Sequence, residues 1–331
     1  MKRAQNSQKA SRQALKVSLI TTERNEAEDI AAFIDSALTQ SLPPDEIVIA
    51  DGGSTDGTVE IIQEYIDKGA PLKLVHAPGN RSIGRNAATE NATYEHIACS
   101  DVGSRLDKDW LKNITQPFRD NPHAMVVSGG FKADPQTFFE NVSATLMLNP
   151  NDHIDVDTWL PSSRSIAYTK TAWKKAGKYP EHTNFNEDTP FDLALKKAGY
   201  KFEDGLKAIV YWRPRPNLRD FYRQYYWYAV GDGIDSLSPD HFLKMYLKYG
   251  IFVITLLLGL LILPWSTVIM LALFGLYIAR RVIGPWRKMK GFKTFALMAL
   301  LIVAFDVSQM MGYAKGYFLK SKLKGSKKLI R

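Results

Sequence analysis

Residues 46–62 read EIVIADGGSTDGTVEII, and this stretch decides the fold. It opens with a near-continuous apolar run, which predicts a buried strand. A polar, glycine-rich turn follows at residues 51–57. Val59, Ile62 and Ile66 then recur at helical spacing. Strand, turn and amphipathic helix in this order are typical of an α/β fold with a mostly parallel, doubly wound sheet and helices on both faces.

The same alternation continues on both sides of this stretch. Upstream, VSLIT at residues 17–21 predicts a strand, and Asn25 is placed to cap the helix after it. Further strands are predicted downstream, at residues 72–76, 97–100 and 125–128. Ligands bind such sheets beyond the carboxyl ends of the strands. Three polar clusters fall there, at residues 22–26, 51–56 and 101–104.

The positive charge of the chain is concentrated in three segments. The 331 residues include 43 basic and 34 acidic residues, a formal charge of +9. Residues 1–16, 280–293 and 315–331 hold 18 of the basic residues and no acidic one, so the remainder is acidic. A nucleic-acid-binding protein is therefore disfavoured, because its basic patch would lie on the folded body. The single cysteine, Cys99, excludes an internal disulfide and a multi-cysteine metal site.

Two long apolar stretches predict membrane helices. Residues 249–279 carry no charge, and residues 294–314 carry only Asp306. A bilayer core of about 30 Å needs about 20 helical residues. We predict a membrane region at 236–317, with helices at about 243–263, 266–282 and 294–314. A single kinked span is the alternative for the first two, and the third either crosses the bilayer or lies in its interface. Asp306 should face protein, water or headgroups.

The flanking basic segments predict the orientation. Residues 1–14 form a polar, basic tail without the apolar core of a signal peptide, and residues 318–331 form a basic C-terminal tail. Basic segments beside apolar ones favour the cytoplasmic side of a membrane. We therefore expect a multi-pass protein of the cell membrane, with its body, residues 15–235, in the cytoplasm.

Several charged side chains at the predicted strand ends are candidates for chemistry. Asp51 and Asp101 each follow a strand directly: the carboxylate of Asp51 can accept hydrogen bonds from a ribose hydroxyl or a base N–H, and that of Asp101 can bind the ribose or a metal. Arg85 lies near a helix start, where anions bind. Asp188 precedes another helix and suits a general base. Each also has a simpler interpretation: an Asx turn for Asp51, a cap for Asp101 and Asp188, and a surface arginine for Arg85.

Six segments together resemble the family 2 glycosyltransferases of the GT-A fold. In chain order they read VSLITTERNEAEDI, IVIADGGSTDGTVEII, SIGRNAA, HIACSDVGSRLDKDWL, SIAYTKTAWKKAGKYPE and NEDTPFDLALKKAGYKF. The likeness covers about residues 15–232. It implies an inverting transfer of a sugar from a nucleoside-diphosphate sugar to an acceptor hydroxyl, in envelope polysaccharide or glycolipid synthesis. It implies donor binding by Thr22, Glu26, Asp51, Arg85 and Asp101, and catalysis by Asp188.

The sequence departs from the family pattern at the metal ligands. The second aspartate of the Asp-x-Asp motif is Gly103, and Trp212 stands where the family often has a metal-binding histidine. Two alternatives remain open for the charge of the diphosphate. Either Mg²⁺ or Mn²⁺ binds through Asp101 and the diphosphate, or arginines replace the metal, with Arg213 and Arg215 as candidates. Salt bridges to the acidic body are the simpler interpretation of both arginines.

The segment at 216–230 is rich in aromatic residues and is expected to form an interfacial helix at the membrane. Processive synthases of the family carry a Gln-x-x-Arg-Trp signature near this place, but Tyr225, Tyr226 and Trp227 follow Gln224 here. This favours transfer of a single sugar, onto a lipid-linked or saccharide acceptor. The second hypothesis is a non-catalytic nucleotide-sugar-binding or scaffolding protein of the same fold. A nicotinamide-dependent dehydrogenase is disfavoured, because no glycine-rich turn follows the first strand.

Overall fold

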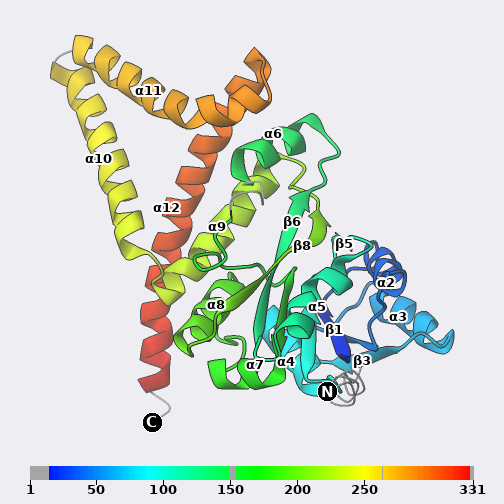
Figure 1. Cartoon of the computed structure of the whole chain (residues 1–331). Helices are drawn as coiled ribbons and strands as arrows, with labels where there is room; N and C mark the ends of the chain where they lie inside the picture. The colour runs from blue at the N-terminus through cyan, green and yellow to red at the C-terminus, as the bar shows by residue number, and fades with distance from the viewer. Residues whose placement is uncertain (1–14, 149–153, 263, 329–331) are drawn as a thin grey trace, which may run out of the picture. The chain divides into compact units, whose positions relative to one another are not determined.

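The computed structural model describes residues 15–148, 154–262 and 264–328. The chain divides into two compact units (Figure 1). The described residues of the first unit are 15–132 and 154–212, and those of the second are 133–148 and 213–328.

An eight-stranded sheet is the framework of the first unit, with strand order β3-β2-β1-β4-β7-β6-β8-β5. The strands are β1 (Val17–Glu23), β2 (Glu46–Asp51), β3 (Leu72–His76), β4 (His96–Cys99), β5 (Ser104–Leu106), β6 (Val126–Ala133), β7 (Ile166–Thr169) and β8 (Phe202–Trp212). Strands β1 to β4 pair in parallel, as the buried strands β1, β2 and β4 predict. Strand β7 pairs antiparallel with β4 and β6, and β5 antiparallel with β8. The sheet is therefore mixed, with a parallel half and an antiparallel half.

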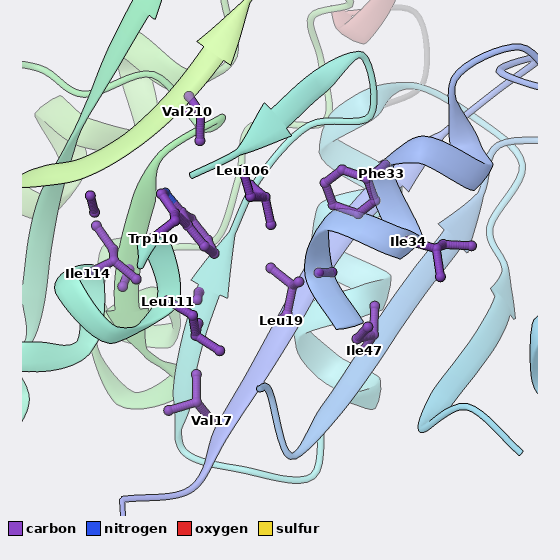
Figure 2. Close-up of a cluster of buried hydrophobic side chains, with 14 of the residues drawn as sticks. Val17, Leu19, Phe33, Ile34, Ile47, Leu106, Trp110, Leu111, Ile114 and Val210 are labelled. Carbon is purple, nitrogen blue, oxygen red and sulfur yellow. The ribbon is translucent and has the colours of Figure 1, made fainter. Parts of the chain in front are cut away.

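Helices cover both faces of this sheet. They are α2 (Ile30–Leu38), α3 (Thr58–Asp67), α4 (Arg81–Asn91), α5 (Trp110–Asp120), α7 (Lys170–Ala176) and α8 (Asp188–Lys197). Alternate residues of a strand point to opposite faces, so Leu19 and Ile20 of β1 enter two different cores. Figure 2 shows the first core, where Phe33 of α2 and Trp110 of α5 pack with Leu19. These two cores hold the strand ends, and hence the candidate site, in fixed positions.

The second unit is helical in its described part. Its helices are α6 (Phe138–Met147), α9 (Leu218–Asp235), α10 (Pro239–Ile262), α11 (Pro264–Lys288) and α12 (Phe292–Lys328). The last three are long and apolar enough to cross a membrane, over Pro239–Leu261, Trp265–Lys288 and Phe292–Lys320. Where the sequence left one kinked span as an alternative, α10 and α11 are separate helices. Helix α12 runs further than the predicted 294–314, because good helix formers such as Lys315 and Lys320 continue it.

Small residues let α12 pack closely against α9. A Cβ atom on Gly312 would lie 2.2 Å from the Tyr226 carbonyl oxygen, and one on Gly316 would lie 2.1 Å from that of Val230. Both distances are far below van der Waals contact, so the two backbones meet only because these residues are glycine.

Asp306 of α12 is buried and paired. It is 1% exposed, forms an ion pair with Arg281 of α11, and accepts a hydrogen bond of 2.7 Å from the Tyr249 hydroxyl of α10. The carboxylate thus faces protein and links three apolar helices, which satisfies the requirement that a charge among such helices has a partner.

Candidate functional site

Parallel pairing brings acidic side chains together at the carboxyl edge of the sheet. The register places Glu23 of β1 opposite Asp51 of β2, and Asp51 opposite His76 of β3. Asp51 is 3% exposed; its Oδ1 accepts a hydrogen bond of 2.9 Å from the Ser54 backbone N–H. Burial acts to raise the pKa of Asp51, but hydrogen bonds from Ser54 and Gly53 outweigh it and hold that pKa below its usual value. Asp51 therefore remains a carboxylate that accepts hydrogen bonds.

Glu23 is a further member of this edge; it lies in the polar cluster at residues 22–26, but nothing in the sequence distinguishes it from its neighbours there. Its Oε2 accepts a hydrogen bond of 3.0 Å from the Ser54 hydroxyl, and its Oε1 is buried without a hydrogen-bond partner among the described residues. Burial raises the pKa of Glu23 to about 7, and the negative charge of Asp51 adds to the increase. The strand register was the signal, since Glu23 is the β1 residue paired with Asp51.

The loop after β1 is tied to the loop after β2. Asn25 has a left-handed backbone with φ 57°, and its Oδ1 accepts a hydrogen bond of 2.8 Å from the Thr55 N–H. The prediction that Asn25 caps the next helix is wrong: α2 begins at Ile30, and Asn25 binds the neighbouring loop instead. The backbone N–H of Glu26 donates to the Thr58 hydroxyl at 2.9 Å in the same way. Glu26 is thus held beside the start of α3.

Thr22 is fixed between β2 and α4. Its hydroxyl donates to the Ala50 carbonyl at 3.1 Å. A Cβ atom on Gly84 would lie 1.8 Å from the Thr22 hydroxyl oxygen, so only glycine lets α4 approach β1 here. The half-buried Thr22 hydroxyl is therefore a rigid part of the edge.

Arg85 of α4 joins two acidic residues from distant parts of the chain. Its side chain is 2% exposed; Nη2 lies 2.7 Å from Asp101 Oδ1 and Nη1 lies 2.5 Å from Glu187 Oε1. Burial would raise the pKa of Asp101, but the positive charges of Arg85 and then Arg164 hold it below its usual value. Arg85 is therefore committed to carboxylates of its own chain at both terminal nitrogens.

Asp188 begins α8, directly after the residue that binds Arg85. It is half-buried, and its Oδ1 accepts a hydrogen bond of 3.0 Å from the Thr189 N–H. Burial and the neighbouring charge of Glu187 raise the pKa of Asp188, although Arg85 and Arg164 oppose the increase. A carboxylate with a raised pKa binds a proton more readily, which suits a general base.

Arg213 and Arg215 make their contacts within the second unit. The guanidinium of Arg213 lies 2.9 Å from Oε1 of Glu140, whose side chain is fully buried. The Nε of Arg215 donates to Gln224 Oε1 at 2.9 Å. The salt bridge of Arg213 matches the simpler of the two interpretations that the sequence left open.

The residues at the expected metal ligands do not form a donor set. Asp101 is bound by Arg85, and Gly103 has no side chain and a left-handed backbone with φ +83°. The indole of Trp212 offers only an N–H donor. Within residues 15–148, 154–262 and 264–328, no group of three or more His, Cys, Asp or Glu residues is arranged to hold a metal. The side chains that are present do not fit the Mg²⁺ or Mn²⁺ site that the resemblance implies.

The comparison with protein families agrees with this architecture. The family model described as "Glycosyl transferase family 2" matches residues 18–181, which span β1 to the segment after α7. The fold is GT-A, and a solved mannosyltransferase from Pyrobaculum calidifontis, in complex with GDP-Man and Mn²⁺, shares it. That likeness has a TM-score of 0.54 at 17% identity and covers 92% of this chain and 86% of the other. The chain belongs to glycosyl transferase family 2.

Two curated relatives are similar to parts of this chain. The succinoglycan biosynthesis protein ExoA of Rhizobium meliloti (strain 1021) is 27% identical over 218 residues, covering 62% of this chain and 66% of the relative. The poly-β-1,6-N-acetyl-D-glucosamine synthase of Staphylococcus epidermidis is 33% identical over 107 residues, covering 32% of this chain and 26% of the relative. The chain thus spans less than two thirds of the length of either relative.

Proposed function

We propose that this chain transfers a sugar from a nucleoside-diphosphate sugar to an acceptor hydroxyl at the cytoplasmic face of a membrane. One observation carries the proposal: Arg85 pairs with Asp101, beyond β4, and with Glu187, next to Asp188. A donor-binding candidate and a candidate base are thereby linked at one edge of the sheet. The match to glycosyl transferase family 2 supports sugar transfer as the reaction of this arrangement.

The nucleoside would be bound at the ends of β1 and β2. Asp51 keeps its charge and would accept hydrogen bonds from a ribose hydroxyl or a base N–H. Thr22, near the end of β1, and Glu26, in the loop after it, would complete this part of the site. Asp101 would accept a hydrogen bond from a ribose hydroxyl on the side nearer the diphosphate.

The reaction would be a single displacement with Asp188 as general base. Asp188 takes the proton of the acceptor hydroxyl as that oxygen bonds to the anomeric carbon. The bond from this carbon to the phosphate oxygen breaks, and the electron pair leaves with the nucleoside diphosphate. Because attack and departure occur on opposite faces, the configuration inverts. The raised pKa of Asp188 favours this role, since a base works best with a pKa near the ambient pH.

The acceptor would be lipid-linked or a saccharide presented at the membrane. Three apolar helices are long enough to cross a bilayer, and basic segments flank them. Two curated relatives are named for polysaccharide synthesis, which supports an envelope polysaccharide or glycolipid as the product class.

The test is a screen of nucleoside-diphosphate sugars with membrane extracts, in which mass spectrometry identifies the product. Asp188→Asn should lower turnover by about 100-fold or more while donor binding persists, because general-base catalysis contributes that much. Asp192→Asn is the matched control: Asp192 is 1% exposed, and burial and the charge of Asp188 raise its pKa well above its usual value. A neutral amide at position 192 should therefore preserve turnover. Donor binding without transfer by the unmodified chain would favour the non-catalytic alternative.

A further inference from the structure

Arg164 rests on aromatic side chains at the carboxyl edge of the sheet. Its Cζ lies 4.7 Å from the centroid of the Trp212 ring and 6.0 Å from that of Phe131. The Phe131 ring in turn stacks on Trp159, with centroids 6.2 Å apart and an interplanar angle of 26°. A guanidinium on a tryptophan face is attracted by the ring electrons and is held flat against it. The aromatic support thus restricts the position of the Arg164 charge.

The antiparallel pairing of β7 with β4 sets Arg164 beside Asp101. Cys99, the last residue of β4, pairs with Ile166, the first residue of β7. The residues just after β4 and just before β7 therefore lie next to each other. The hydroxyl of Ser100, which is fully buried, donates to the Arg164 carbonyl at 2.8 Å and fixes this contact.

The guanidinium of Arg164 retains its hydrogen-bond donors. Among the described residues it forms neither a hydrogen bond nor an ion pair, and the side chain is only half-buried. Its charge nevertheless acts on both carboxylates: it lowers the pKa of Asp101 and opposes the raised pKa of Asp188. Arg85 differs, because both of its terminal nitrogens are occupied.

We infer that Arg164, supported by Trp212 and Phe131, binds the diphosphate of the donor and takes the place of a divalent metal. The inference rests on the proposed function. It explains why Trp212 and Gly103 stand where metal ligands are expected: a stacked arginine needs an aromatic face, and without a metal no second carboxylate is required at position 103. A guanidinium binds phosphate oxygens through paired N–H donors. As the glycosidic bond to the phosphate breaks, it would stabilise the charge on the leaving nucleoside diphosphate.

The experiment measures binding of UDP, GDP, ADP, CDP and dTDP, and of the corresponding nucleosides, to the full chain in detergent. Arg164→Gln should weaken binding of the preferred diphosphate by about 10- to 100-fold and leave the nucleoside within about twofold. Addition of EDTA should change the affinity of the unmodified chain by less than about twofold. Arg105→Gln is the matched control, because Arg105 also stacks on an aromatic ring, at 4.3 Å from the Tyr211 centroid.

The outcomes distinguish failure of the Arg164 inference from failure of the proposed function. An unchanged diphosphate affinity in Arg164→Gln, or a tenfold loss with EDTA in the unmodified chain, overturns the inference and leaves the proposed function intact. No binding of any diphosphate by the unmodified chain overturns the proposed function itself. If the glutamine variant does not fold, Arg164→Lys replaces it: the charge stays but the paired donors are lost, so binding of the diphosphate should weaken about threefold or more. An unchanged affinity in the lysine variant then overturns the inference.

Discussion

Arg85 Nη1 lies 2.5 Å from Glu187 Oε1, and both side chains are almost fully buried. This contact joins α4 to the residue that precedes α8, 102 positions along the chain. Glu187 also raises the pKa of its neighbour Asp188. This ion pair thus joins α4 to the start of α8 and places a negative charge beside the proposed base.

Glu187→Gln should destabilise the first unit and change the pH dependence of turnover. It leaves the buried guanidinium of Arg85 with one charged partner, at a cost of about 3–5 kcal/mol. It also removes a negative charge beside Asp188, which lowers the pKa of that group. The acid limb of the profile of kcat/KM against pH should therefore move to lower pH. Thermal unfolding and pH–rate profiles measure the two effects.

Glu90→Gln is the control for this change. Glu90 forms a surface ion pair of 3.3 Å with Lys178, and such pairs contribute about 0–1 kcal/mol. This variant should melt close to the unmodified chain and keep its pH profile. An acid limb that stays in place in Glu187→Gln would show that Glu187 does not tune Asp188.

Glu23→Gln should stabilise the protein more at pH 8 than at pH 5. Burial raises the pKa of Glu23 from 4.5 to about 7, so the native state loses stability as the pH rises from 4.5 to 7. A neutral glutamine removes this loss, which is on the order of 2–3 kcal/mol. Melting temperatures of both proteins at the two pH values provide the measurement.

Glu60→Gln, at an exposed position of α3, is the matched control for Glu23 and should show the same melting difference at both pH values. Should Glu23→Gln stabilise equally at pH 5 and pH 8, Glu23 would be ionised in both and the raised pKa would be wrong.

The parallel half of the fold was predictable because its signals are local. Strand β2 is a near-continuous apolar run and β1 is rich in apolar residues, and each is followed by a polar loop and a helix. The antiparallel half depends on pairings between distant segments, such as β5 with β8. Strand β8 mixes buried, half-buried and exposed residues without a regular alternation, so its neighbours cannot be read from composition.

The candidate site divides in the same way. Asp51, Asp101 and Asp188 follow or begin elements that the sequence marks, and the sequence identifies them as candidates. Glu23 and Arg164 were not singled out. Glu23 becomes a candidate only through its register with β2, and Arg164 only through its stacking on Trp212. Contacts of this kind form only when segments far apart in the chain meet.

Gly316→Ala should disrupt the packing of α12 on α9. The added Cβ atom would lie 2.1 Å from the Val230 carbonyl oxygen, so the helices must separate. Overpacking of this kind costs about 1–3 kcal/mol. Gly275→Ala on α11 is the control, since its Cβ would meet nothing within 4 Å. Thermal unfolding in detergent compares the two, and equal melting temperatures would contradict the close approach of α9 and α12.

Restoring the missing ligands should give the site a response to metal. The double variant Gly103→Asp, Trp212→His supplies a carboxylate and an imidazole, and both are ligands for divalent ions. The Cβ at position 103 meets nothing within 4 Å, and aspartate tolerates the left-handed backbone there better than most residues.

Loss of Trp212 in the double variant also removes the support of Arg164. Affinity for the preferred nucleoside diphosphate should therefore become weaker without Mn²⁺ and should recover at least about fivefold with it. Gly103→Ala, Trp212→Phe carries no ligands and should show no recovery. A response to Mn²⁺ in the unmodified chain as large as in the double variant would mean that the native residues already hold a metal and that Arg164 has not replaced it.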